Sequence, residues 1–556
     1  MNEQVDLEEL APWLVFAITL VGGGLRLLLL RTKGLWLDET FSIWLANQSI
    51  PDLLDWVSKI DQHPPLYYLL LHFWIGRFGD LPYFTRLLSA LLGAGTIPLI
   101  YLIGKRLSGA VVGLAAAVFL ALSPFHIYFA QETRMYTLLT FNAAVALYAL
   151  ARLLTDERVV QPIGSQLREY VRAWRSPEPI GPAHEDEFSY SRIYRDKPGW
   201  RGWIARHNWL PLRAIETDLA WIGFILFTAA TMLSHNTAVL LPLTANIFVL
   251  ALIRLRKQNS SLHAPSLGSW VKAQIGILLL WSPWLSPFIN QVRSVDQRFW
   301  IPEPTGAIVM QTFKTFLNAS APMAPGQAIV IWSGYALVLG FGLLHLRKKP
   351  SRLLLLLTLF ALPVLGELLV SLRRPIFYDR TLLWTTIPLF LLLAAGVAQF
   401  RYRFLMLLVL GGLGTLNLFA VSDYYRFFQK EDWETAAGYV ALYAEPGDLV
   451  LFNSNFVVIP FNYFFEAYEN LYDIRVNKQG VPRDLFDDAV LEPLMTESDI
   501  PELLSLLNGQ DRVWLVYSHA SYTDPTGLIP QTLASQRELI QQRDFYGGQV
   551  RLYGLP

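Results

Sequence analysis

Long apolar runs separated by short polar segments recur along most of the chain. Many of them approach the roughly 20 residues that an α-helix needs to cross the hydrocarbon core of a bilayer. The sequence therefore predicts a polytopic α-helical membrane protein, because spanning helices satisfy their own backbone hydrogen bonds inside lipid. We expect about 11 spans, at residues 11–31, 83–104, 109–125, 135–153, 219–234, 237–253, 270–289, 327–345, 353–372, 381–399 and 404–421.

Two stretches break this pattern. Residues 66–78 are apolar but short for a span and follow Pro64 and Pro65, so we expect a helix that lies in the membrane interface. Residues 155–218 are polar and rich in arginine and proline, which predicts a cytoplasmic insertion. A partly disordered or interfacial insertion is favoured there over a catalytic role.

The composition changes near residue 423. Residues 433–443 have the pattern of a helix, and residues 448–453 and 512–517 have the pattern of buried strands. We therefore predict a transmembrane domain over residues 1–422 and a small α/β domain over residues 423–556. This second domain carries no glycine-rich phosphate-binding pattern, so no chemistry is assigned to it.

Basic residues in short loops set the orientation of the spans, because Lys and Arg are retained on the cytoplasmic side. Residues 105–106, 254–257, 347–349 and 401–403 mark cytoplasmic ends in the eleven-span arrangement. We therefore expect a multi-pass protein of the plasma or inner membrane with its C-terminal domain outside. Two basic clusters remain on the outer side: Arg31 with Lys33, and Arg373 with Arg374.

Composition narrows the functional classes. The chain is 53% hydrophobic and 16% charged, with a mean hydropathy of +0.34 and a formal net charge of zero, so nucleic-acid binding has no electrostatic support. It contains no cysteine, which excludes disulfides, thiolate metal sites and cysteine nucleophiles. Residues 1–10 are acidic and lack a cleavage site, so the first apolar run is expected to be a retained span.

Two adjacent carboxylates, Asp38 and Glu39, follow the first span. Ionisable groups beside hydrocarbon are costly unless they are solvated or paired, so such a pair indicates a functional site. The alternative is a wet loop that carries two solvated acids. Further polar residues of the outer segments are predicted to gather around the pair in one cavity: His63, Glu132, Arg134, Tyr136, His235, Arg374, Tyr378 and Arg380.

Acids, a histidine and arginines together fit chemistry on a phosphorylated substrate. Arginine binds phosphate through two parallel charge-assisted hydrogen bonds, and a nearby carboxylate can take a proton from an acceptor hydroxyl or amine. Each residue alone has a simpler explanation: His235 as a helix cap, Arg134 and Arg380 as interface anchors, and Trp36 and Tyr136 as members of an aromatic belt.

Several motifs occur together in a fixed order: Trp36-Leu37-Asp38-Glu39, His63-Pro64-Pro65-Leu66-Tyr67-Tyr68, Gln131-Glu132-Thr133-Arg134-Met135-Tyr136, Ser234-His235-Asn236, and Arg380 followed by Pro388 and Ala394-Ala395-Gly396. They resemble the polyprenyl-phosphate-sugar-dependent glycosyltransferases of the GT-C fold. Within that fold they are most similar to the relatives of protein mannosyltransferases and aminoarabinose transferases, often called the glycosyltransferase family 39 or RgtA/B/C/D-like group. The resemblance covers roughly residues 12–150 and 219–400. The insertion at 155–218 departs from it, and residues 430–556 match only loosely.

The resemblance implies catalytic roles for three acids. Asp38 is expected to act as the base that activates the acceptor, or as a ligand that orients it, and Glu39 to support it. Glu132 is expected to bind the acceptor or a metal ion. A divalent cation with Asp38 and Glu132 as ligands is compatible with the residue types, although no spacing demands one.

The resemblance also implies substrate contacts. Arg380, with Arg374, His235 and Arg134, is expected to bind the phosphate of the lipid-linked donor. His63, Tyr136 and Tyr378 are expected to contact the acceptor or the sugar. Positioned cations would stabilise the charge that develops on a departing lipid phosphate, and direct displacement with a single base predicts inversion at the anomeric carbon.

The prediction is thus a membrane glycosyltransferase that moves a sugar from a polyprenyl-phosphate donor to a glycan, lipid or protein acceptor on the non-cytoplasmic face. Two rivals stay open. A transporter or flippase of a lipid-linked or anionic substrate would show internal repeats and broken helices at mid-membrane. A non-catalytic envelope interaction protein would keep its function when Asp38 is neutralised.

Overall fold

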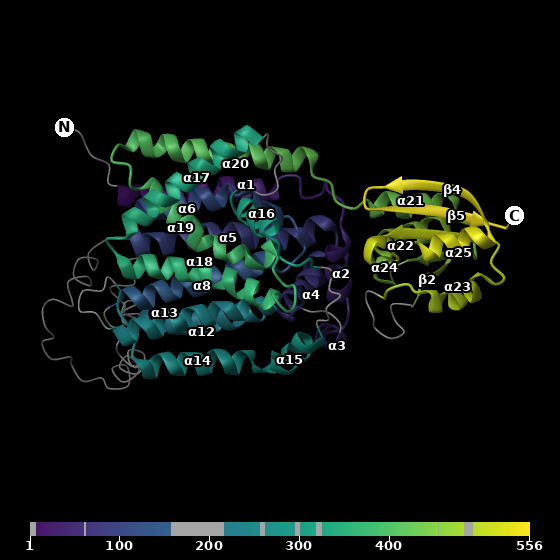
Figure 1. Ribbon diagram of the computed structural model, residues 1–556, viewed down its shortest axis with the longest axis horizontal. Helices are drawn as coiled ribbons and strands as arrows, with labels where there is room; N and C mark the ends of the chain where they lie inside the picture. Colours follow the sequence, from purple (N-terminus) through teal and green to yellow (C-terminus); the bar gives the residue numbers. More distant parts are fainter. Residues whose placement is uncertain are drawn as a thin grey trace, which may run out of the picture.

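The apolar runs form long helices that lie side by side, and a small α/β domain follows at one end of this bundle (Figure 1). The computed structural model describes residues 7–59, 63–156, 216–255, 262–294, 301–318, 325–453, 455–482 and 493–555. The predicted fold class, a polytopic helical protein with a C-terminal α/β domain, is confirmed within these ranges. The expected insertion at 155–218 lies outside them except for its first two and last three residues.

Nine helices in the described part of the chain are long and apolar enough to cross a membrane. They are built from α1 (Leu7–Leu27), α5 (Pro82–Ser108), α8 (Tyr136–Thr155), α13 (Leu240–Leu255), α14 (Leu267–Trp281) with α15 (Leu285–Ser294), α17 (Pro325–Leu346), α18 (Pro350–Ser371), α19 (Thr386–Val397) and α20 (Arg403–Phe427). The expected span at 219–234 falls on α12 (Glu216–Met232), which is short for a span.

The expected span at 109–125 is a bent pair, α6 (Ala110–Ala121) and α7 (Pro124–Ala130), with an angle of 58° between the two helices. Pro124 has no N–H to give to the carbonyl of Leu120, so the α-helical ladder stops there. Arg26 of α1 supplies the missing donor through Nη2 at 2.9 Å, and its Nη1 donates to the carbonyl of Ala121 at 3.1 Å. Taken together as one bent span, α6 and α7 bring the number of candidate spans in the described residues to ten. The broken ladder also explains why Arg26 is buried among apolar helices.

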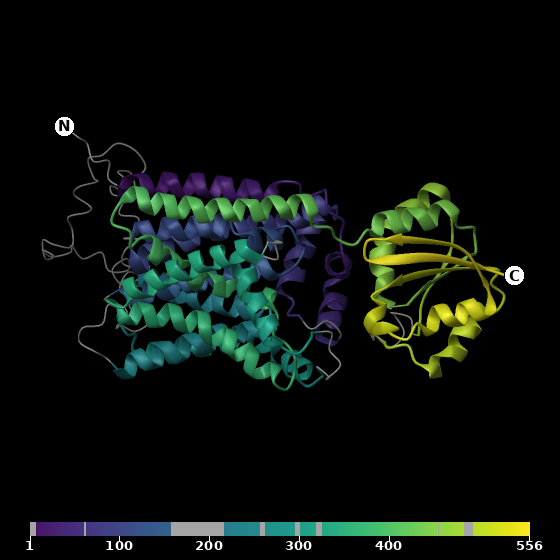
Figure 2. The same ribbon diagram turned by 45° about the horizontal axis from the view of Figure 1, so that its top comes forward.

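Three short helices cover the end of the bundle that faces the C-terminal domain: α2 (Leu37–Ala46), α3 (Ile50–Lys59) and α4 (Leu66–Phe78) (Figure 2). Helix α4 has the bounds that the sequence predicts for an interfacial helix. The carbonyl of Val57 in α3 accepts from Gln291 Nε2 of α15 at 2.8 Å, and α2 packs against α22 (Val458–Tyr472) of the C-terminal domain. A further helix, α16 (Gly306–Asn318), packs against α7 and α20.

The C-terminal domain contains a five-stranded sheet in the order β2-β1-β3-β5-β4. Strand β1 (Leu449–Phe452) pairs in parallel with β2 (Asn477–Gly480) and β3 (Arg512–Ser518), whereas β5 (Gly548–Gly554) runs antiparallel to β3 and to β4 (Glu538–Phe545). The helix at 433–443 and the strands β1 and β3 match the sequence expectation. The expected domain boundary at 422 falls inside α20, which ends at Phe427.

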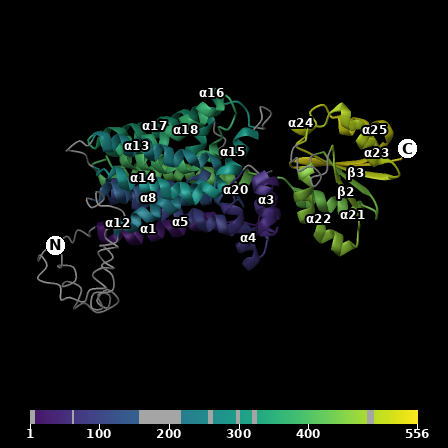
Figure 3. The ribbon, with the colours of Figure 1, turned by 90° about the horizontal axis from the view of Figure 1, so that it is seen from below.

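Helices cover both faces of this sheet (Figure 3). Successive side chains of a strand point to opposite faces, so Val450 and Trp514 pack on the side of α21 (Trp433–Tyr443) and α22. Leu451 and Leu515 pack on the side of α23 (Ile500–Leu507) and α25 (Leu528–Gln536). The face under α23 and α25 therefore has a separate core, whereas the side chains under α21 and α22 belong to the same buried cluster as the helical bundle.

Candidate active site at the domain-facing end of the bundle

Helix α2 presents the two adjacent acids in its first turn. Its preceding residue, Trp36, has an extended backbone and gives no side-chain cap. The carboxylate of Glu431 caps the helix instead, because its Oε2 accepts the N–H of Leu37 at 3.0 Å. Acids in a first helical turn are favoured by the helix dipole, so Asp38 and Glu39 are compatible with this position.

Asp38 faces two arginines from distant segments. Its Oδ2 lies 3.3 Å from Nη1 of Arg380 and 3.7 Å from Nη2 of Arg134. Arg134 Nη1 also donates to the backbone carbonyl of Asp38 and to Ser42 Oγ, both at 3.2 Å. The Asp38 side chain is 26% exposed, so a substrate can reach it. We call Asp38, Arg134 and Arg380 the arginine–aspartate cluster.

Glu39 points into the protein and is fully buried. Arg86 of α5 donates to its carboxylate through Nε at 2.8 Å and through Nη2 at 2.7 Å. Lys430 lies at 2.7 Å and the backbone N–H of Thr133 donates at 2.9 Å. Burial alone would raise the pKa of Glu39, but the charges of Arg86 and Lys430 outweigh it and lower the pKa. The acid is therefore ionised and holds four chain segments together.

Glu132 is also fully buried, and it shares Lys430 with Glu39 at the longer distance of 3.2 Å. Burial raises the pKa of Glu132, and the negative charge of Glu39 adds to this effect against the attraction of Lys430. Glu132 is thus enclosed with Lys430 in this structure, and its expected role in binding the acceptor or a metal ion stays a prediction. We call Glu39, Arg86, Glu132 and Lys430 the enclosed network.

Aromatic rings surround the guanidinium of Arg380. The guanidinium carbon Cζ of Arg380 lies 4.8 Å from the ring centre of Tyr378 and 5.4 Å from that of Tyr136, within the range of cation–π contacts. Arg380 is the second residue of the 3-10 helix η4 (Asp379–Thr385). The hydroxyl of Thr381 fixes η4 to α18, because it donates to both carboxylate oxygens of Glu367, each at 2.8 Å. Both expected tyrosines therefore lie beside the cluster.

The two expected histidines lie next to each other, with His63 and His235 ring centres 5.3 Å apart. His235 Nδ1 accepts the N–H of Thr237 at 3.2 Å and caps η2 (Asn236–Val239), as its simpler explanation predicts. Burial and then the charge of His63 lower the pKa of His235 well below 6.5. The expected contact of His235 with the donor phosphate stays a prediction. Its ring still lies 6.1 Å from that of Tyr136.

Arg374 does not join the cluster. Among the described residues, no hydrogen bond or ion pair links it to Asp38 or Arg380, and its Nη1 is buried without a hydrogen-bond partner. The structure adds two cations that the motifs did not indicate, Arg86 and Lys430. An arginine inside an apolar run is itself a functional signal, so Arg86 could have been found, whereas nothing in the sequence near Lys430 marks it.

The divalent cation expected at Asp38 and Glu132 stays a prediction. In the part of the chain that the structure describes, no three His, Asp or Glu side chains gather in a way that could hold a metal ion. Asp38 faces arginines and Glu132 faces Lys430, so each expected ligand already neutralises a protein cation. We therefore carry no metal ion into the proposed mechanism.

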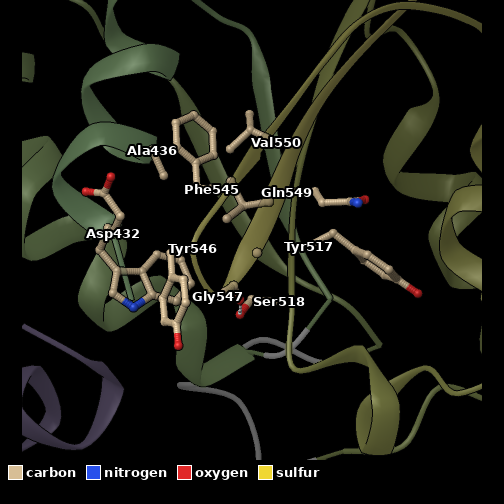
Figure 4. Close-up of a pocket in the computed structure, with 12 residues that line it drawn as sticks. Asp432, Ala436, Tyr517, Ser518, Phe545, Tyr546, Gly547, Gln549 and Val550 are labelled. Atoms are coloured by element: carbon tan, nitrogen blue, oxygen red, sulfur yellow. Dashed lines mark hydrogen bonds between the residues drawn. The ribbon is translucent and has the colours of Figure 1, made fainter. Parts of the chain in front are cut away.

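A small hollow of the C-terminal domain lies outside this cluster (Figure 4). Tyr517, Ser518, Tyr546, Gly547 and neighbouring residues line it, at the end where β3 meets β5. Its lining is largely apolar and brings no acid and base together, so we assign it no chemistry.

Known structures share this architecture. ArnT from Cupriavidus metallidurans in the apo state aligns with a TM-score of 0.56 at 12% identity, over 97% of both chains. ArnT bound to undecaprenyl phosphate gives 0.50 at 11% identity, over the same shares. An Archaeoglobus fulgidus oligosaccharyltransferase tethered with an acceptor peptide gives 0.50 at 10% identity, over 100% of this chain and 74% of that chain. The chain has a GT-C fold.

The GT-C fold predicted from the motifs is thus confirmed. The family described as dolichyl-phosphate-mannose-protein mannosyltransferase matches residues 62–165. This segment of the GT-C fold carries Arg86, Glu132, Arg134 and Tyr136. No curated protein matches the sequence. Family and fold both relate the chain to glycosyltransferases, and the arginine–aspartate cluster joins a partly exposed carboxylate to two arginines at the domain-facing end of its bundle.

Proposed function

We propose that the protein transfers a sugar from a polyprenyl-phosphate donor to an acceptor, with Asp38 as the base. The observation that carries this proposal is the contrast in access among the three acids. Asp38 is partly exposed and lies against two arginines, whereas Glu39 and Glu132 are enclosed. One reachable base beside two cations fits the transfer of a group from a phosphate.

In the proposed step, the oxygen or nitrogen of the acceptor attacks the anomeric carbon and its proton passes to the Asp38 carboxylate. The bond between that carbon and the phosphate oxygen breaks, and the lipid phosphate leaves with the electron pair. Arg380 and Arg134 stabilise the negative charge that appears on the phosphate. A single displacement of this kind inverts the configuration at the anomeric carbon.

The arginines have two partners in this mechanism. A phosphate that reaches Arg380 shares its guanidinium with Asp38, which lies 3.3 Å away. Any weakening of that ion pair makes the carboxylate a better base, since an opposite charge nearby favours its ionised form. Donor binding would therefore prepare Asp38 for the acceptor. The aromatic rings of Tyr136 and Tyr378 keep Arg380 in place for both partners.

The fold neighbours support a lipid-linked donor. One of them was crystallised with undecaprenyl phosphate and another with an acceptor peptide. The match to the mannosyltransferase family agrees with a lipid-phosphate sugar. A polyprenyl tail also explains why the cluster lies at the end of a bundle of apolar helices rather than in the C-terminal domain.

We further propose that the cluster faces the non-cytoplasmic side. Helix α5 has 27 residues and runs from the loop that holds Asp80 to the basic residues Lys105 and Arg106. At about 1.5 Å per residue its two ends lie on opposite sides of a bilayer. Basic residues favour the cytoplasm, which leaves the start of α5, Arg86 and the cluster outside.

The test is Asp38→Asn in the purified full-length protein. We expect transfer from a polyprenyl-phosphate sugar to fall about 1,000-fold, because the amide has the same shape but cannot accept the proton. The melting temperature should stay near that of the wild type, because Asp38 is partly exposed.

Asp55→Asn is the matched control. Asp55 is an exposed acid of α3 at the same end of the bundle and pairs with Lys59 at 2.6 Å. This variant should transfer sugar at the wild-type rate. Wild-type turnover in Asp38→Asn would reject Asp38 as the base, and transport of the lipid substrate without sugar transfer would favour the flippase alternative.

A further inference from the structure

The segment that joins α20 to the C-terminal domain passes directly against the helix that carries Asp38. Lys430 of this segment enters the enclosed network. The next residue, Glu431, presses its backbone carbonyl against Gly34, so closely that a Cβ at Gly34 would lie 2.5 Å from that oxygen. The segment is therefore packed into the site and is not a free tether.

The carboxylate of Glu431 connects both parts of the protein. Its Oε2 accepts the first N–H of α2, from Leu37 at 3.0 Å, and the indole N–H of Trp433 at 2.7 Å. Its Oε1 lies 3.1 Å from Nε2 of His519, directly after β3 in the C-terminal domain. One side chain thus contacts the N-terminus of α2 through Oε2 and the C-terminal domain through both oxygens.

His519 is held in turn by its own domain. Its Nδ1 lies 2.9 Å from Ser518 Oγ, and that hydroxyl donates to the carbonyl of Gly547 at 2.6 Å. Ser518 and Gly547 lie together at the end where β3 meets β5 (Figure 4). The ring of His519 also lies 5.9 Å from that of Phe456. The imidazole is therefore fixed relative to the sheet.

We propose that Glu431 and His519 are positioning residues for the Asp38 carboxylate, and that the C-terminal domain sets the active-site geometry through them. Helix α2 has no cap of its own, so its first turn depends on Glu431. Asp38 is the second residue of that turn. A displacement of about 1 Å at a reacting group can reduce the rate about 100-fold, so a small movement of α2 is enough. This inference rests on the proposed transferase function.

The enzymatic test compares Glu431→Ala, Glu431→Gln and His519→Ala in the full-length protein. We expect Glu431→Ala to lower kcat about 10-fold or more, with little change in the KM for the lipid donor, because Arg380 and the aromatic rings are untouched. Glu431→Gln should recover most of this activity, because its amide oxygen can still accept from Leu37 and Trp433. His519→Ala should give a smaller loss of kcat.

Glu434→Ala is the matched control, since Glu434 is an exposed acid three residues further along the chain, in the first turn of α21. It should behave as the wild type. Equal losses in the alanine and glutamine variants of Glu431, or wild-type kcat in Glu431→Ala, would overturn the proposal.

A second measurement reports the position of α2 without any activity. The chain has no cysteine, so Asn47→Cys at the end of α2 and Arg373→Cys on the bundle can carry two spin labels. We expect the distance distribution to broaden in Glu431→Ala and to return toward the wild type in Glu431→Gln. An unchanged distribution in Glu431→Ala rejects the positioning role. Failure of the transferase proposal would instead appear as undiminished transfer in Asp38→Asn.

Discussion

Two neighbouring residues of α2 belong to regions of opposite character. Asp38 lies in the arginine–aspartate cluster, where its carboxylate is partly exposed and the distances to the two arginines are 3.3 and 3.7 Å. Glu39 lies in the enclosed network, where two cations approach to 2.7 Å and the carboxylate is fully buried. Consecutive residues of a helix point in directions about 100° apart, so a single turn supplies both regions.

The difference in burial gives two similar carboxylates different roles. The enclosed carboxylate has its full set of partners, so it can gain nothing from a substrate, and breaking its pairs leaves a buried charge. The exposed carboxylate has longer contacts with room for exchange, so a phosphate can compete for its arginines. We therefore expect changes in the enclosed network to affect folding and changes in the cluster to affect catalysis.

The largest effect should come from Arg86→Met. Arg86 donates twice to Glu39 and also binds the backbone carbonyls of Leu30, Lys33 and Gly34. Its removal leaves buried acceptors without donors, and we expect a loss of about 3–5 kcal/mol in the free energy of unfolding. Thermal unfolding in detergent and the yield of monodisperse protein measure this.

Lys59→Met gives the comparison for that variant. Lys59 pairs with Asp55 at the surface, where its side chain is 67% exposed. Exposed ion pairs contribute about 0–1 kcal/mol, so this variant should melt close to the wild type. An Arg86→Met protein with wild-type stability would show that the enclosed network does not hold the fold.

The next effect is catalytic. Arg380→Lys should lower kcat for sugar transfer about 100-fold, because an ammonium group cannot bind phosphate with two parallel hydrogen bonds. Its melting temperature should change little, because Arg380 keeps 12% of its side chain exposed and its ion pair is with a partly exposed acid, Asp38. Steady-state kinetics with the lipid donor, together with thermal unfolding, separate the two effects.

Arg374→Lys is the control for this variant, since Arg374 is a basic residue of the same loop that lies outside the cluster. We expect wild-type kinetics from it. A loss in Arg374→Lys equal to that of Arg380→Lys would return Arg374 to the donor site, as the motifs first implied.

The sequence was sufficient to predict the helical bundle and to predict that polar residues of its outer segments meet. Apolar length located the spans, and the motifs indicated Asp38, Arg134 and Arg380, which lie 96 and more positions apart in sequence and meet in one cluster. The sequence did not predict which of the two adjacent acids, Asp38 or Glu39, points into the protein. That direction depends on where helix α2 begins. That start depends on Glu431, whose contact with Leu37 of α2 spans 394 positions of the sequence.

In the C-terminal domain, too, the sequence predicts only part of the structure. Strands β1 and β3 are buried and apolar, so their pattern is visible in the sequence. Strand β4 is mostly exposed and β2 reads Asn-Lys-Gln-Gly, so neither shows the alternation that indicates a half-buried strand. These two strands form the edges of the sheet, where hydrophobic patterning is weakest.

The smallest effect should distinguish the two buried glutamates. Burial raises the pKa of Glu132, and the neighbouring charge of Glu39 adds to this. An acid whose folded pKa is raised destabilises the fold at high pH, and this cost disappears as pH falls below its unfolded value near 4.5. Glu132→Gln should therefore melt at or slightly above the wild-type temperature at pH 8, with a difference that shrinks toward pH 4.5.

Glu39→Gln should show the opposite sign. Burial opposes ionisation of Glu39, but Arg86 and Lys430 lower its pKa overall. Its ionised form stabilises the fold above the unfolded pKa near 4.5, and this stability is lost as pH falls through the lower folded value. Glu39→Gln should thus melt below the wild type at neutral pH and approach it in acid. Parallel pH profiles for the two variants would mean that Lys430 does not distinguish the acids, although it lies 0.5 Å closer to Glu39 (2.7 against 3.2 Å).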